Sequence, residues 1–134
     1  MIKHLIGASI LTLLPVLAAA ESHGGMDGDA KKGERVFRKC QACHAVGEDA
    51  KNKVGPVLNG VVGRPVASVE DFAYSDTLKE MGAEGKTWTP EDLAAFLEKP
   101  RDYAKGTKMA FAGLRKEEER ADVIAFLMTH KMGE

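Results

Sequence analysis

The chain has 134 residues, of which 44% are hydrophobic and 29% are charged, and its formal net charge at pH 7 is -1. This length favours one domain with a modest core. A nearly neutral charge argues against nucleic acid as a partner.

The first twenty residues are typical of a secretory signal peptide. Lys3 and His4 begin it, an apolar run follows from Leu5 to Leu17, and three alanines at 18–20 fit a cleavage site after Ala20. The apolar run is short for a membrane span, although an uncleaved anchor remains an alternative. Cleavage after residue 20 would leave 114 of the 134 residues and remove one positive charge, Lys3. We therefore expect an exported protein.

Residues 21–28 contain three glycines and no apolar periodicity, which predicts a flexible N-terminal tail. A helix is predicted from Asp29, a good N-cap residue, because apolar and small residues follow at spacings of three and four: Ala30, Gly33, Val36, Phe37 and Cys40. A glycine inside a helix costs about 1 kcal/mol relative to alanine. Gly33 therefore indicates the close approach of another helix.

The pentapeptide Cys40-Gln41-Ala42-Cys43-His44 is the attachment motif of a c-type haem. On one helical turn, Cys40, Cys43 and His44 project from the same face. The two thiols can bond covalently to a haem, while the imidazole becomes the proximal ligand of its iron.

Three other interpretations of the cysteine pair are a thioredoxin-type redox motif, half of a zinc site and a disulfide. A zinc site would need further ligands close by, and the remaining histidines are scattered: His4, His23 and His130. Thioredoxin chemistry would need a βαβ pattern, and no alternation of the kind that marks strands is present. Because covalent haem attachment in bacteria takes place outside the cytoplasmic membrane, the motif and the leader together predict a periplasmic location.

Residues 45–69 are predicted to be loop. Ser75 can cap a short helix that ends near Met81, with Gly82 as the residue that stops it. Thr89 and Pro90 then mark a stronger helix start. We expect this next helix to bury Leu93, Phe96 and Leu97 and to end at Pro100.

A last helix is predicted to open with three glutamates at 117–119, which suit the positive end of its dipole. Its buried side should contain Ala121, Ile124, Leu127 and Met128. The predicted fold class is all-α.

A second axial ligand would decide what a haem in this chain does, since a strong sixth ligand makes an electron carrier and an open position makes a gas binder or an enzyme. Met81 and Met109 are the methionines best placed for this role in the sequence. Met109 lies in the irregular segment 105–113 between two helices, which could cover the far face of a haem. It is the better candidate.

The motifs together resemble the class I c-type cytochromes, of the mitochondrial cytochrome c and bacterial cytochrome c2 or c550 type. The resemblance extends from about Gly28 to Leu127. It rests on Gly33 and Phe37 ahead of the haem motif, and then on Gly55-Pro56-Val57-Leu58, Gly63-Arg64, Trp88 and Gly106-Thr107-Lys108-Met109. It implies that residues 29–134 form a small haem domain in which the N- and C-terminal helices cross and loops wrap around one covalent haem c.

The resemblance also implies residue roles. His44 and Met109 would be the axial ligands, Cys40 and Cys43 the covalent attachments, and the Pro56 carbonyl the acceptor of a hydrogen bond from the His44 ring. The other cofactor contacts would be Arg64, Tyr74 and Trp88 around a propionate, together with Thr107. Two positions depart from the mitochondrial pattern: Phe96 replaces a tyrosine and Leu78 replaces an asparagine.

The function that follows is one-electron transfer without substrate chemistry, so the chain is not expected to be an enzyme. The main alternative is a haem enzyme or gas sensor with a labile sixth ligand. A third class of function is a metal-binding or disulfide module without haem.

By the family's geometry, basic side chains would surround the haem edge and dock acidic faces of redox partners: Arg35, Lys39, Lys53, Arg101, Lys105, Lys108, Arg115 and Lys116. The partners could be a bc1-type complex, an oxidase, a reaction centre, or a periplasmic reductase or dehydrogenase. Contact with membrane complexes would be transient, and the protein is expected to be a monomer.

Overall fold

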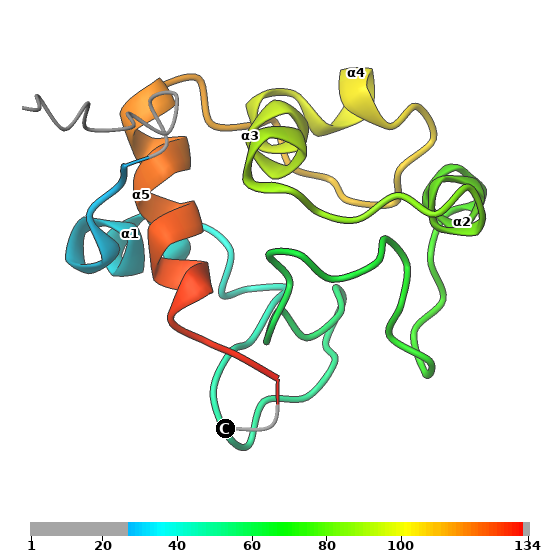
Figure 1. Ribbon diagram of the computed structural model, residues 1–134, viewed down its shortest axis with the longest axis horizontal. Coiled ribbons are helices and arrows are strands. Elements are labelled where there is room, and N and C mark those ends of the chain that lie inside the picture. Colours follow the sequence, from blue (N-terminus) through cyan, green and yellow to red (C-terminus); the bar gives the residue numbers. More distant parts are fainter. Residues whose placement is uncertain (1–26, 133–134) are drawn as a thin grey trace, which may run out of the picture.

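A computed structural model describes residues 27–132, so the predicted signal peptide at 1–20 and most of the predicted tail at 21–28 lie outside the described residues. Five helices follow in chain order: α1 (Ala30–Phe37), α2 (Asp76–Ala83), α3 (Pro90–Glu98), α4 (Pro100–Tyr103) and α5 (Glu117–Met128) (Figure 1). In this part of the chain the β structure amounts to one isolated bridge between Pro65 and Thr87. The predicted all-α class is confirmed. None of the helices within residues 27–132 is long and apolar enough to cross a membrane.

Three helices begin where a polar side chain caps them, as predicted. The carboxylate of Asp29 accepts hydrogen bonds from the backbone N–H groups of Lys31 and Lys32 at 2.9 and 3.1 Å. The bond from Lys32 is the main cause that lowers the pKa of Asp29. In the same way, Ser75 caps α2 and Thr89 caps α3. These caps pair N–H groups that a helix leaves free at its start.

The end of α2 differs from the prediction, because Gly85 rather than Gly82 stops this helix. Gly85 has a φ of +83°, and its N–H donates to the carbonyl of Gly82, while the N–H of Lys86 donates to that of Met81. This pair of bonds is the Schellman ending of a helix. Gly82 lies inside α2, where a Cβ atom would collide with the Val66 carbonyl oxygen.

Pro100 ends α3 as predicted, since the last residue of that helix is Glu98. The helix α4 was not predicted. It is a single turn that Pro100 itself begins. Proline fits this first position because its fixed φ suits a helix and its missing N–H is not needed there.

The crossing of α1 and α5 closes the fold (Figure 1). Gly33 is buried at the crossing, and a Cβ atom on it would collide with the backbone carbonyl of Asp122. The N–H of Asp29 donates to Asp122 Oδ1 at 2.7 Å, and the rings of Phe37 and Phe126 lie 5.2 Å apart. The predicted approach of another helix at Gly33 is confirmed.

The core joins side chains from α1, α3 and α5, and the buried residues of α3 are the three predicted ones. For α5 the prediction was partly wrong: Met128 is 53% exposed, whereas Val123, which was not predicted to be buried, is 1% exposed. The reason is that α5 packs against both α1 and α3, so its buried surface is wider than one stripe.

Replacing Gly33 with alanine should destabilise the protein. We expect Gly33→Ala to lower the free energy of unfolding by about 1–3 kcal/mol, since the added methyl group forces α1 and α5 apart. Denaturant unfolding measures the change. Glu34→Ala, at an exposed position of the same helix, is the matched control and should stay within about 0.5 kcal/mol of the parent. Equal stability of the two variants would contradict the tight crossing.

Candidate haem site

The haem motif forms one hydrogen-bonded turn directly after α1. The N–H of Cys43 donates to the carbonyl of Cys40 at 3.1 Å, and the N–H of His44 donates to the same carbonyl at 2.9 Å. The predicted single turn is therefore present, although it lies outside α1. It places the three motif side chains on the same side of the backbone.

Both cysteines are free and half-buried, so the structure does not support the disulfide alternative. Cys40 packs against the hydrophobic core. Burial raises the pKa of Cys40 to about 11, which keeps its sulfur protonated at neutral pH.

His44 is held by a hydrogen bond between its Nδ1 atom and the carbonyl oxygen of Pro56, at 2.7 Å. A carbonyl oxygen can only accept, so Nδ1 carries the proton and the lone pair of Nε2 is left for a metal ion. Burial lowers the pKa of His44 below its usual value, and the bond to Pro56 opposes this effect. The imidazole is therefore neutral at pH 7, which is the form that binds iron.

Gly55 lies directly against the His44 ring. A Cβ atom on Gly55 would come within 2.8 Å of both ring nitrogens. The N–H of Gly55 also donates to the carbonyl of Cys43 at 2.8 Å, which fixes the loop beside the motif. The site thus has room for the imidazole only because residue 55 has no side chain.

Arg64 and Trp88, which lie far apart in the sequence, are brought together by backbone pairing. The N–H of Gly63 donates to the carbonyl of Trp88 at 2.7 Å, and the N–H of Trp88 donates to that of Arg64 at 2.8 Å. The Trp88 side chain is buried. Two of the residues expected around a propionate are therefore neighbours in space.

The guanidinium of Arg64 is partly unsatisfied. Its Nη1 donates to the carbonyls of Val57 and Asn59 at 3.1 and 3.0 Å, whereas its buried Nε has no partner among residues 27–132. Burial lowers the pKa of Arg64, and nearby Tyr74 has the opposite effect. A buried donor without a partner is costly, and a haem propionate is an acceptor that would satisfy it.

Tyr74 is buried, and its hydroxyl accepts a hydrogen bond from the N–H of Val69 at 3.2 Å. The N–H of Thr107 donates to the carbonyl of Ala104 at 3.0 Å. Met109 is half-buried against the core, in a segment without regular structure. Met81, the other candidate ligand, also packs against the core but lies within α2.

Phe96 is buried in an aromatic cluster with Trp88 and Tyr103, at ring distances of 5.0 and 6.0 Å. The hydroxyl of Tyr103 donates to Asp92 Oδ1 at 3.0 Å. Burial, followed by this bond, raises the pKa of Tyr103 to about 12. Leu78, the second departure from the mitochondrial pattern, is half-buried against the core.

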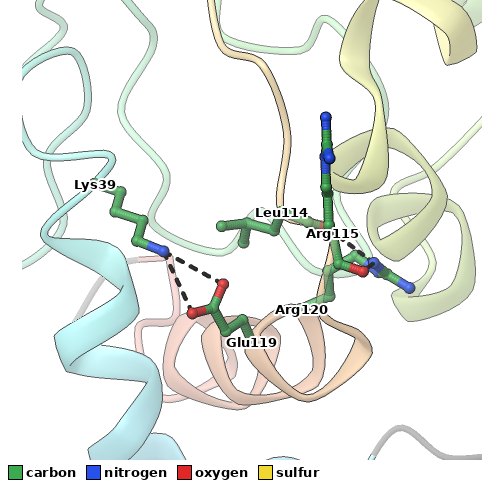
Figure 2. Close-up of polar contacts among 5 residues, drawn as sticks. All are labelled: Lys39, Leu114, Arg115, Glu119 and Arg120. Atoms are coloured by element: carbon green, nitrogen blue, oxygen red, sulfur yellow. Dashed lines mark hydrogen bonds and ion pairs between the residues drawn. The ribbon is translucent and has the colours of Figure 1, made fainter.

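The eight basic residues expected to dock partners are all exposed. The side chains of three of them form an ion pair or a hydrogen bond. Lys39 forms an ion pair with Glu119 of α5, at 3.3 Å to each carboxylate oxygen (Figure 2). Lys53 and Lys108 donate to backbone carbonyls, which leaves their charges intact.

Figure 2 also shows Arg120, whose Nη1 donates to the carbonyls of Leu114 and Arg115 at 2.7 and 2.9 Å. These bonds fix the chain just before α5, next to the ion pair. Arg115 itself stays exposed, so its charge remains available on the surface.

Sequence reasoning missed Asn59. Its side chain both accepts from the N–H of Gly47 and donates to the carbonyl of Gly47, at 2.8 and 2.7 Å. Since its own backbone carbonyl accepts from Arg64, Asn59 links the loop after the motif to the buried guanidinium. An asparagine before a glycine is typical of a turn, so nothing local in the sequence indicated this distant contact.

Comparison with known proteins decides the family. The family model for cytochrome c matches residues 30–131. The chain belongs to the cytochrome c family. It is 58% identical over 98 residues to cytochrome c-550 of Ancylobacter novellus, covering 73% of this chain and 92% of that one. It is 50% identical over 102 residues to cytochrome c2 of Agrobacterium tumefaciens, covering 76% and 92%.

The fold agrees with solved cytochrome structures. Cytochrome c2 from Rhodospirillum centenum superposes with a TM-score of 0.72 at 44% identity, covering 78% of this chain and 99% of that one. The protein is thus a class I c-type cytochrome with one covalent haem c, and Cys40 and Cys43 fit its attachment. Members of this family transfer electrons and are not enzymes, so the enzyme alternative is not supported.

The residues present fit this cofactor. A free Nε2 lone pair on a neutral imidazole, two adjacent thiols and a buried arginine with a spare donor are the groups that a covalent haem with propionates requires. The space beside Gly55 holds the imidazole in the orientation that its bond to Pro56 sets.

Gly55→Ala should impair the haem site of this cytochrome. We expect less covalently bound haem per chain, because the new methyl group displaces the His44 ring and weakens its bond to Pro56. Haem absorbance relative to total protein measures this. Gly47→Ala is the control: it strains a residue with a φ of +113° but meets nothing within 4 Å. If the two variants retained equal haem, contact with His44 would not be the cause.

Proposed function

We propose that this cytochrome is a periplasmic one-electron carrier in which His44 and Met109 are the axial ligands of the haem iron. The observation that carries the proposal is the 2.7 Å contact between His44 Nδ1 and the Pro56 carbonyl, because it leaves Nε2 free to bind. The haem supplies a reversible one-electron change at its iron. The residues of the chain bind, orient and attach the haem.

The structure and the sequence support the proposed role of each residue in different ways. Pro56 orients the imidazole and increases its basicity, and Cys40 and Cys43 keep the cofactor attached. The Arg64 side chain offers its spare Nε–H to a propionate. Met109, half-buried in the segment before α5, supplies a thioether, a ligand that raises the reduction potential of a haem.

The proposed periplasmic location is supported by the leader-like residues 1–20 and by the haem motif. Electron exchange with membrane complexes and with periplasmic redox enzymes is proposed from the same location. The names cytochrome c-550 and cytochrome c2 of the bacterial relatives agree with such a role.

Met109→Ala tests the axial ligand. The ferric holoprotein should show a sulfur-to-iron charge-transfer band in its visible spectrum, and the variant should lose it. The reduction potential should also fall, because a thioether favours the ferrous state. Met81→Leu is the control and should keep both properties. Loss of the band in Met81→Leu but not in Met109→Ala would assign the ligand to Met81 instead.

We further propose that exposed basic residues steer the cytochrome to acidic faces of its partners. Five of the eight expected residues are exposed, and within residues 27–132 their side chains form no ion pair or hydrogen bond: Arg35, Arg101, Lys105, Arg115 and Lys116. Lys39 should contribute less than these, because Glu119 neutralises its charge at 3.3 Å. Such steering weakens as salt screens the charges.

Two substitutions separate a free charge from a paired one. Lys105→Ala should slow electron exchange with a bc1-type complex about two- to fivefold at low salt, whereas Lys39→Ala should change it less. Glu119→Gln should accelerate exchange, since it releases the charge of Lys39. Stopped-flow rates over a range of ionic strength measure all three. Rates that do not depend on salt or on these residues would contradict docking by charge.

A further inference from the structure

The segment that carries Met109 has little structure of its own. Residues 104–109 lie between α4 and α5 and bend at Gly106, whose φ is +85°. Within the segment, the N–H of Thr107 donates to Ala104 at 3.0 Å, and the N–H of Met109 makes a long bond of 3.4 Å to the hydroxyl of Thr107. Its position must therefore depend on contacts with other parts of the chain.

Two such contacts come from residues 73–77, which lead into the first turn of α2. The hydroxyl of Thr77 donates to the carbonyl of Lys105, and Nζ of Lys108 donates to the carbonyl of Ala73 at 3.2 Å. Gly106 lies between them, where a Cβ atom would be 3.5 Å from the Thr77 oxygen. In Figure 1 the segment after α4 passes beside α2, as these bonds require.

Thr77, which donates the first of these bonds, is better fixed than residues 104–109, whose Lys105 carbonyl accepts it. Thr77 lies in the first turn of α2, whose cap Ser75 is buried and accepts from the N–H of Leu78 at 3.3 Å. The carbonyl of Ser75 also accepts from the N–H of Lys79 at 3.0 Å. Thr77 is thus held firmly in α2. The loosely bonded segment is attached to it at Lys105, which lies four residues before Met109.

We propose that Thr77 is a positioning residue for Met109, and that Lys108 contributes more weakly to the same positioning. By holding the Lys105 carbonyl, Thr77 disfavours the movement of the segment in which the thioether leaves the iron. This inference rests on the proposed ligand role of Met109. It assigns to α2 the control of how readily the sixth ligand is exchanged.

The consequence can be measured with imidazole, which binds the ferric iron only when the sulfur is displaced. The apparent affinity for imidazole therefore rises in proportion to the open fraction. A hydroxyl-to-carbonyl bond contributes enough that its loss should increase this affinity about 2- to 10-fold. Lys108 is exposed, so Lys108→Ala should give a smaller increase in the same direction.

The experiment titrates ferric holoprotein with imidazole and follows the charge-transfer band. Thr77→Val removes the donor, and Thr77→Ser restores it and should return the affinity to that of the parent. Thr129→Val is the matched control, since Thr129 also donates to a backbone carbonyl, that of Phe126, but at the far end of α5. It should leave imidazole affinity unchanged.

Hydrogen exchange gives a second readout that does not depend on the iron. In Thr77→Val the amides of Thr107 and Met109 should exchange faster, while those of α5 stay protected. Uniformly faster exchange, or equal imidazole affinities of Thr77→Val and Thr129→Val, would overturn the positioning role.

Failure of the ligand assignment would look different. In that case Met109→Ala would keep the visible spectrum of the parent and would bind imidazole as the parent does. If instead the parent has the band, Met109→Ala binds imidazole tightly and Thr77→Val behaves as the parent, then only the role of Thr77 is wrong.

Discussion

The hydrogen bond between His44 and the Pro56 carbonyl is the constraint on which the haem site depends. It selects one tautomer, fixes the ring and leaves the lone pair of Nε2 free to bind iron. Gly55 makes the bond possible, since any side chain there would occupy the space of the ring. The loop after the motif is in turn held by Asn59 and Arg64, so the orientation of one imidazole is supported by residues as far as twenty positions away in the sequence.

Much of the fold was predictable because its signals are local. The caps Asp29, Ser75 and Thr89 act on N–H groups two or three residues away, and the buried residues of α3 follow helical spacing. The errors concern features that distant residues decide. Gly82 is needed because α2 passes close to the Val66 carbonyl, not because the helix ends there, and the exposure of Met128 depends on how α5 fits against two other helices.

The same division applies to the site. The attachment motif is contiguous, so residue order was enough to predict Cys40, Cys43 and His44 as one group. The family resemblance supplied the contact of His44 with Pro56, and the structure contains it. The pairing of Arg64 with Trp88, the ion pair of Lys39 and the attachment of residues 105–109 to α2 join segments between which no spacing rule applies. These contacts could be identified only from the three-dimensional structure.

The crossing at Gly33 has a consequence for the order of folding. α1 and α5 stand at opposite ends of the haem domain in sequence, so Gly33 stays uncovered until these two helices pack together. Until then the turn that follows α1 is attached to an incomplete core. Long-range closure of this kind is slow relative to local helix formation. The late pairing of the two ends therefore leaves an interval in which covalent loading can precede folding.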